Sequence, residues 1–89
     1  MNPAKPRTAV DLQVTFGSNV SAARLAAGLT QHELAQKAGM SQQYLSRIEL
    51  GQINLTLRSM LQLATELGQD VVCMLSRPTS SKSRKRERQ

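Results

Sequence analysis

The sequence has few aromatic residues and almost no cysteine. Phe16 and Tyr44 are the only aromatic side chains among 89 residues, and Cys73 is the single cysteine. A core must therefore be built from aliphatic residues, and this composition favours helices over sheets, whose strands are rich in β-branched and aromatic residues. One cysteine can form neither an internal disulfide nor a zinc cluster, so we expect a reducing compartment.

Long apolar runs and recognisable catalytic sets are also missing. The chain contains no apolar run long enough to span a membrane, and its N-terminus lacks a signal-peptide core. His32 is the only histidine, and neither converging carboxylates nor a glycine-rich phosphate loop can be recognised. We expect a cytoplasmic protein that is not an enzyme, with no cofactor, no metal site, no small-molecule substrate and no membrane partner.

Positive charge is abundant overall but concentrated at the two ends. The net charge is +6 at pH 7. Residues 1–10 carry two cations, residues 77–89 carry six against one glutamate, and residues 11–76 carry four against five carboxylates. Proline and cations at the start, and serine and cations at the end, are typical of a flexible basic arm over 1–10 and a disordered basic tail over 77–89. The residues between these two ends, 11–76, are expected to form one domain.

Four helices are predicted in this domain from capping residues, apolar spacing and glycine stops. The first covers about 11–27, and a T-x-x-E capping box at Thr30 begins the second. Ser41 is a good N-cap for the third helix, and Thr56 for the fourth. The apolar stripe of the fourth helix is expected to consist of Leu57, Met60, Leu61, Ala64 and Leu67.

The last apolar run, "DVVCML", allows two interpretations. It could be a fifth helix capped by Asp70, but a run of five residues that begins Val-Val favours a short strand. A single strand needs a partner, and its copy in a second subunit is the obvious one. The dimer interface would then consist of Val71, Val72, Cys73, Met74 and Leu75.

Residues 31–50 contain two short helices joined by a tight turn. Ala35 is small where the helices must approach, Gly39 suits a positive φ, and Leu45 and Ile48 are spaced to face inward. This pattern resembles the helix-turn-helix of the XRE-type family, which includes phage repressors and Cro. The wider string "GLTQHELAQKAGMSQQYLSRIELGQINLTLRSMLQLATELG" is similar to that family as well. The resemblance implies an all-α domain of four to five helices whose recognition helix, over 42–50, enters the DNA major groove.

The outward face of the recognition helix follows from helical spacing. With Leu45 and Ile48 buried, the side chains directed outward are Gln42, Gln43, Ser46 and Arg47. Glutamine can pair with adenine and arginine with guanine, so the resemblance implies base contacts there, although such a face can also be simple solvated surface. It further implies phosphate contacts at Gln31, Ser41, Tyr44, Asn54 and Arg58.

The resemblance also gives Arg24 and Glu49 a structural role. An arginine late in the first helix and a glutamate at the end of the recognition helix form an ion pair in the family, and both occur here at matching positions. Gln31, which begins the second helix, could also brace Gln42.

The implied function is sequence-specific transcription regulation on double-stranded DNA. We expect a repressor that binds a near-palindromic operator as a homodimer, with a basic tail that adds non-specific attraction to phosphates. One alternative is an antitoxin of the HipB type, which would bind a toxin protein and regulate its own operon. Such antitoxins combine this fold with a C-terminal strand that pairs across the dimer, and "LGQDVVCML" resembles that arrangement. Another is a restriction–modification controller, which shares the "NLTLRSM" pattern. An adaptor that no longer binds DNA is a third alternative, and the outward glutamines and arginine argue against it.

Overall fold

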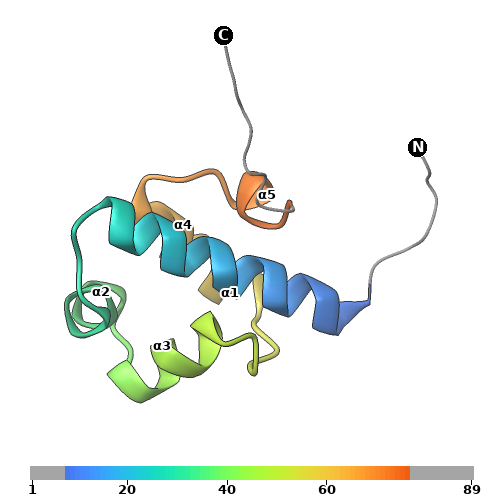
Figure 1. Cartoon of the computed structure of the whole chain (residues 1–89), viewed down its shortest axis with the longest axis horizontal. Coiled ribbons are helices and arrows are strands. Elements are labelled where there is room, and N and C mark those ends of the chain that lie inside the picture. Colours follow the sequence, from blue (N-terminus) through green and yellow to red (C-terminus); the bar gives the residue numbers. More distant parts are fainter. Residues whose placement is uncertain (1–7, 77–89) are drawn as a thin grey trace, which may run out of the picture.

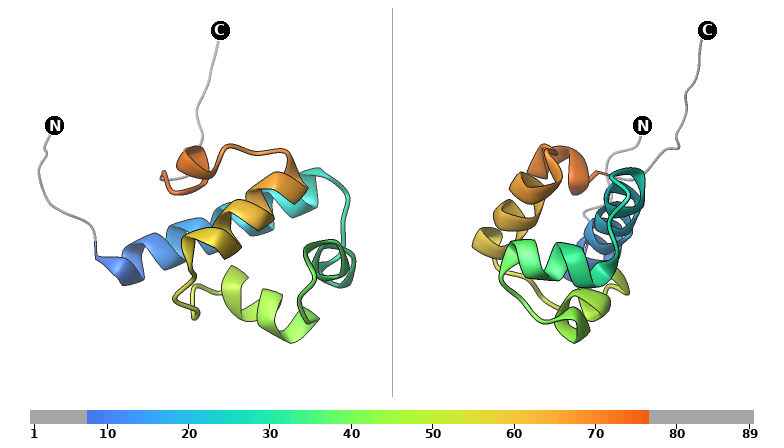
Figure 2. Two further views of the ribbon diagram at one scale, coloured as in Figure 1. Left: turned by 180° about the vertical axis from the view of Figure 1, so that it is seen from behind. Right: turned by 90° about the vertical axis from the view of Figure 1, so that its left-hand side faces the viewer.

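A computed structural model describes residues 8–76 as five α-helices. Their bounds are α1 Ala9–Ala26, α2 Gln31–Ala38, α3 Gln42–Glu49, α4 Leu57–Leu67 and α5 Val71–Met74. Most of the predicted arm and all of the predicted tail lie outside the described residues. In Figure 1, α1 crosses the middle of the molecule with α3 on one side and α5 on the other, and the left view of Figure 2 shows the same arrangement from behind.

Each helix begins at a capping side chain. At the start of α2, Thr30 Oγ1 accepts a hydrogen bond from Glu33 N at 3.0 Å, and Thr30 N donates to Glu33 Oε1 at 2.8 Å. The same box, formed by Thr8 and Asp11, begins α1 at Ala9. The first helix therefore starts two residues earlier than the sequence predicted, within the stretch expected to be an arm.

The core lies where α1 packs against the other helices. Burying one Leu, Ile or Phe side chain contributes about 1.5–3 kcal/mol. α3 is therefore seated on the domain by its two buried aliphatic side chains, as the spacing predicted. The largest fully buried side chains are Phe16, Val20, Leu34, Leu45, Ile48 and Leu63.

The face of α4 that meets the core differs from the predicted one. Leu63 and Ala64 are buried, whereas Leu57 and Leu61 are 76% and 57% exposed. α4 carries apolar residues on more than one side, so its periodicity is compatible with two inward faces. Packing against α1 and α2 buries the side that contains Leu63. The predicted stripe was wrong at Leu57 and Leu61.

The apolar run after α4 forms a helix, and the predicted strand was wrong. Asp70 caps α5, and its Oδ1 accepts a hydrogen bond from Val72 N at 2.8 Å. Asn19 of α1 donates from Nδ2 to the backbone oxygen of Met74 at 2.7 Å, which fixes the end of α5 on α1. Residues 8–76 contain no strand, and Met74 is 3% exposed within the core of its own chain. Strand pairing across a dimer is therefore excluded for this segment.

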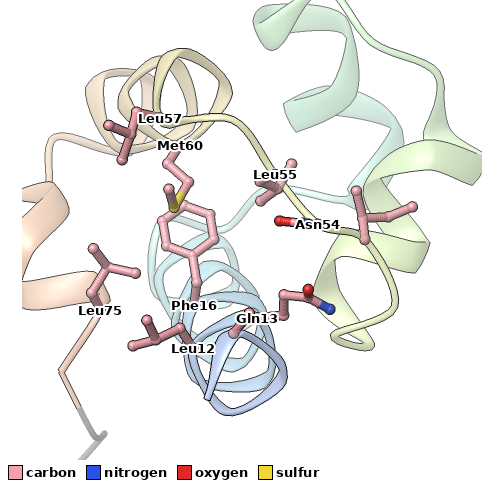
Figure 3. Close-up of a pocket in the computed structure, with 10 residues that line it drawn as sticks. Leu12, Gln13, Phe16, Asn54, Leu55, Leu57, Met60 and Leu75 are labelled. Atoms are coloured by element: carbon pink, nitrogen blue, oxygen red, sulfur yellow. The ribbon is translucent and has the colours of Figure 1, made fainter. Parts of the chain in front are cut away.

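An apolar pocket of about 190 Å³ lies between the first half of α1, the loop before α4 and the end of α5 (Figure 3). Phe16 and Met60 lie close together in this view, with Leu12 and Leu75 beside them. The lining contains no charged side chain, and its polar groups come from Gln13 and Asn54. The pocket is smaller than the roughly 300–1,000 Å³ of ordinary ligand sites.

Candidate nucleic-acid interface

The outer face of α3 is polar and open to solvent. Gln42, Gln43 and Arg47 are exposed, and Ser46 is half-buried between them. Within residues 8–76, the side chains of Gln42, Gln43 and Arg47 have no hydrogen-bond or ion-pair partner. A shallow hollow of the surface is lined by Gln43, Ser46 and Arg47. The donors and acceptors of this face are therefore available to a ligand.

The C-terminal end of α3 is tied to α1 by the expected ion pair. Arg24 Nε donates to Glu49 Oε2 at 2.7 Å, and Arg24 Nη2 donates to Glu49 Oε1 at 3.2 Å. A third nitrogen, Nη1, donates to the backbone oxygen of Leu29 at 2.8 Å. The two side chains are only 11% and 6% exposed. Loss of either partner would leave a buried charge unpaired, which is strongly destabilising.

Two further contacts between α1 and the end of α3 were missed by the sequence analysis. A Cβ on Gly17 would overlap the backbone oxygen of Ile48, so the two backbones meet where a side chain would not fit. Gln13 Nε2 donates to the backbone oxygen of Gly51 at 3.2 Å. A glycine inside a helix was the available signal, because it often marks a close approach of another backbone.

Gln31 points toward the end of α3 and not toward Gln42. Its Nε2 donates to Glu49 Oε1 at 3.0 Å, and the residue is half-buried. Glu49 thus accepts hydrogen bonds from α1 and from the start of α2 at the same time. This contact was not predicted, because no pattern along the chain indicates that Gln31 and Glu49 lie next to each other.

The turn between α2 and α3 is fixed by the backbone. Gly39 has φ 71°, the left-handed conformation expected from its position, and Met40 N donates to Ala35 O at 2.9 Å. Gln62 of α4 donates to Ala38 O at 2.6 Å. Ser41, one of the expected phosphate contacts, caps α3 by accepting a hydrogen bond from the backbone of Tyr44 at 3.0 Å.

The other expected phosphate contacts lie around α3. Tyr44 is 37% exposed, Asn54 is exposed in the loop before α4, and Arg58 is exposed in the first turn of α4. Arg24 is occupied by Glu49, so the exposed cations within residues 8–76 are Lys37, Arg47 and Arg58. The described surface therefore offers amide groups and few cations.

Glu33 brings a negative charge to the start of α2. The backbone and side-chain hydrogen bonds of Thr30 hold the pKa of Glu33 below its usual range, and the nearby charges of His32 and Lys37 act in the same direction. The carboxylate therefore remains ionised to lower pH than an ordinary glutamate.

Neither a metal site nor a membrane-spanning helix occurs in the part of the chain that the structure describes. Within residues 8–76, no group of three or more His, Cys, Asp or Glu residues is placed to hold a metal ion. No helix there is long and apolar enough to cross a membrane.

Comparison with known proteins identifies the family. A family model described as "Helix-turn-helix" matches residues 20–72, which include α2, α3 and α4. The chain belongs to the XRE-type helix-turn-helix family of DNA-binding transcription regulators. The helix-turn-helix predicted at residues 31–50 corresponds to α2 and α3. In helix-turn-helix proteins generally, the second helix of the motif is the one that lies in the major groove.

Individual members of the helix-turn-helix family agree with this assignment. The uncharacterized HTH-type transcriptional regulator y4dJ of Sinorhizobium fredii is 42% identical over 59 residues, which cover 66% of this chain and 77% of that protein. The hypothetical transcription factor NHTF from Neisseria superposes with a TM-score of 0.75 at 28% identity, covering 90% of each chain. The restriction–modification controller protein C.AhdI of Aeromonas hydrophila gives a TM-score of 0.65 at 36% identity, covering 72% of this chain and 96% of that chain.

Proposed function

We propose that this protein is a sequence-specific repressor of transcription that binds a near-palindromic operator as a dimer. The observation that carries the proposal is the outer face of α3, where Gln42, Gln43 and Arg47 have no partner within residues 8–76. These side chains can make bidentate contacts with adenine and guanine in the major groove, each worth about 1–3 kcal/mol of discrimination. Ser46 lines the same hollow of the surface as Gln43 and Arg47, and its hydroxyl would be a further hydrogen-bonding group on this face.

Phosphate contacts in this proposal flank α3. Arg58 and Asn54 lie on the side of α4, and Ser41 and Tyr44 lie in the first turn of α3. Gln31 would add its backbone amide at the start of α2, since its side chain donates to Glu49. Such contacts set the position of the protein on the duplex without reading sequence.

Dimerisation follows from the two-fold symmetry that we propose for the operator. Two copies of α3 would enter successive major grooves about 34 Å apart. Val72, on α5, is 68% exposed, and Leu57 and Leu61 of α4 are exposed as well, so α4 and α5 carry unburied apolar side chains. We assign the contact between subunits to this part of the surface, with Val71, Cys73 and Leu75 at its edge.

Selection of bound sequences from a random DNA pool tests the proposal. The full chain should enrich a site with two-fold symmetry and half-sites separated by one helical turn. A pool without enrichment would contradict sequence-specific binding and would favour an adaptor that binds protein. An enriched site without symmetry would contradict only the proposed dimer, and sequence-specific binding would stand.

A restriction–modification controller is the second candidate, and one observation favours it. The controller C.AhdI is 36% identical and is covered over 96% of its length. The genes beside this one provide the test, because a controller is expected next to a restriction enzyme and a methyltransferase. The antitoxin alternative has lost its main support, since it depended on a strand at residues 71–75 and that segment forms α5.

A further inference from the structure

We infer that Gln31 is a positioning residue for base recognition, which acts on α3 through Glu49. The inference rests on the proposed function and adds to it a residue that controls specificity without touching a base. Gln31 Nε2 donates to Glu49 Oε1 at 3.0 Å, and both residues are at least half-buried.

The carboxylate of Glu49 is the point where three helices meet. Glu49 ends α3, Arg24 belongs to the last turn of α1, and Gln31 is the first residue of α2. Oε2 accepts from Arg24 Nε, while Oε1 accepts from both Arg24 Nη2 at 3.2 Å and Gln31 Nε2 at 3.0 Å. Hydrogen bonds to a charged group are stronger and more directional than neutral ones.

The two donors restrain different motions of α3. Arg24, together with the close approach at Gly17, holds the end of α3 against α1. Gln31 ties the same carboxylate to α2, which lies on the other side of the helix-turn-helix turn. Without this bond, the end of α3 would keep its contact with α1 but could rotate slightly relative to α2, while the turn at Gly39 stays in place.

Such a rotation would affect base contacts much more than phosphate contacts. Gln43 and Arg47 have to meet base edges with the geometry of a bidentate pair, whereas phosphate attraction tolerates small displacements. A direct phosphate contact by the Gln31 side chain would have the opposite signature, because it would contribute equally to binding of every sequence.

The experiment compares Gln31→Ala with the wild-type chain on the selected operator and on random DNA. Operator affinity should fall by roughly ten-fold, while affinity for random DNA should stay within about two-fold of wild type. Gln36→Ala is the matched control, since it makes the same change on the exposed side of α2 at a glutamine with no partner among residues 8–76. It should change neither affinity.

Glu49→Gln tests whether Gln31 acts through Glu49. In that background a single neutral acceptor oxygen remains for Arg24 and Gln31, so the additional change Gln31→Ala should alter the ratio of operator to random affinity much less than it does in wild type. An equal change in both backgrounds would show that Gln31 acts independently of Glu49 and would overturn the inference.

The outcomes separate the inference from the proposed function. Equal losses on operator and random DNA, or no loss on either, overturn the positioning role while wild-type selectivity stands. Partial unfolding would also lower both affinities equally, and circular dichroism of each variant identifies that cause. A wild-type chain that shows no sequence preference would overturn the proposed function together with this inference.

Discussion

Arg24 and Glu49 hold the C-terminal end of α3 on α1. Their side chains are nearly buried, and within residues 8–76 the carboxylate of Glu49 accepts its hydrogen bonds from Arg24 of α1 and Gln31 of α2. This ion pair was predictable because the family resemblance assigned both positions. The role of Gln31 was not predictable, since it depends on the distance between the start of α2 and the end of α3, which no sequence pattern specifies.

Replacing Arg24 by Ala should lower the free energy of unfolding by about 3 kcal/mol, because Glu49 would be left buried without its counter-ion. Urea denaturation followed by circular dichroism measures this. Arg58→Ala is the control and should change stability by less than about 0.5 kcal/mol, since Arg58 is exposed and has no partner within residues 8–76. Similar stabilities of the two variants would contradict a structural role for Arg24.

Glu33 should make stability depend on pH in the acid range. Its pKa in the folded chain is held below the usual range by hydrogen bonds from Thr30, so its contribution is complete above the ordinary glutamate pKa. The contribution is lost as the pH falls through the lower, folded-state pKa. Glu33→Gln should therefore flatten the acid limb of the curve of unfolding free energy against pH.

The same curve measured for two other variants tests this explanation. Thr30→Ala removes the capping hydroxyl but keeps the backbone N–H that donates to Glu33, so it should flatten the acid limb in the same direction but only partly. Glu66→Gln, on the exposed side of α4, controls for the change in net charge. Equal flattening by Glu66→Gln would assign the effect to overall charge and not to the capping box.

At the scale of helices, the sequence predicted where helices form and which residues cap them. It was less successful in predicting which face of each helix is buried. Thr30, Ser41, Thr56 and Asp70 all cap helices in the structure. The buried face of α4 was predicted wrongly because this helix has apolar residues on two sides. The fifth element was assigned wrongly because a short apolar run fits a strand as well as a helix. In both cases tertiary packing decided the outcome, as the burial of Leu63 and Met74 shows.

Gly17→Ala should destabilise the chain although alanine favours helices. A Cβ at this position would overlap the backbone oxygen of Ile48, and forcing α1 and α3 apart should cost about 1–3 kcal/mol beyond the gain in helix propensity. Thermal unfolding is the measurement. Ser18→Ala, at the next and exposed position of α1, should leave the midpoint unchanged or raise it slightly. A rise for both variants would mean that α1 and α3 do not meet closely at Gly17.

Val72→Asp should dissociate the dimer that we propose. Val72 is 68% exposed on α5, so the change should leave the fold intact while it places a charge in the contact between subunits. Sedimentation velocity of the free protein and of the DNA complex gives the mass. Val10→Asp, which alters a valine of 61% exposure on α1, is the control. An unchanged dimer mass for Val72→Asp would remove α5 from the interface.

At the scale of the whole molecule, positive charge is distributed unevenly along the chain, and we propose that DNA attraction and base recognition are divided in the same way. Residues 11–76 carry four cations against five carboxylates, while residues 77–89 carry six cations. Ser76 follows α5, which lies on the side of α1 opposite to α3 (Figure 2). A segment of 13 residues can extend about 45 Å, more than the longest dimension of residues 8–76, 39 Å. The length of residues 77–89 is therefore sufficient for the contact that we propose between this segment and DNA bound at α3.

Deleting residues 77–89 should reduce the salt dependence of DNA binding without changing the preferred sequence. Each phosphate contact that is lost should lower the slope of log affinity against log salt by about 0.9. Fluorescence anisotropy at several salt concentrations measures the slope. A full-length chain in which the six cations of residues 77–89 are replaced by glutamine separates the effect of charge from the effect of tail length. It should show the same reduced salt slope as the deletion. A changed consensus sequence would contradict the division between attraction and recognition.

The most direct test of base reading by α3 is the operator selected by Arg47→Ala beside that selected by the wild-type chain. Arg47 is exposed and unpaired within residues 8–76, so its loss should leave the fold unchanged. We predict that one position in each half-site loses its preference for guanine, with operator affinity reduced by about 1–3 kcal/mol and random DNA bound nearly as before. An unchanged consensus, or equal weakening on every sequence, would contradict the claim that the outer face of α3 reads DNA bases.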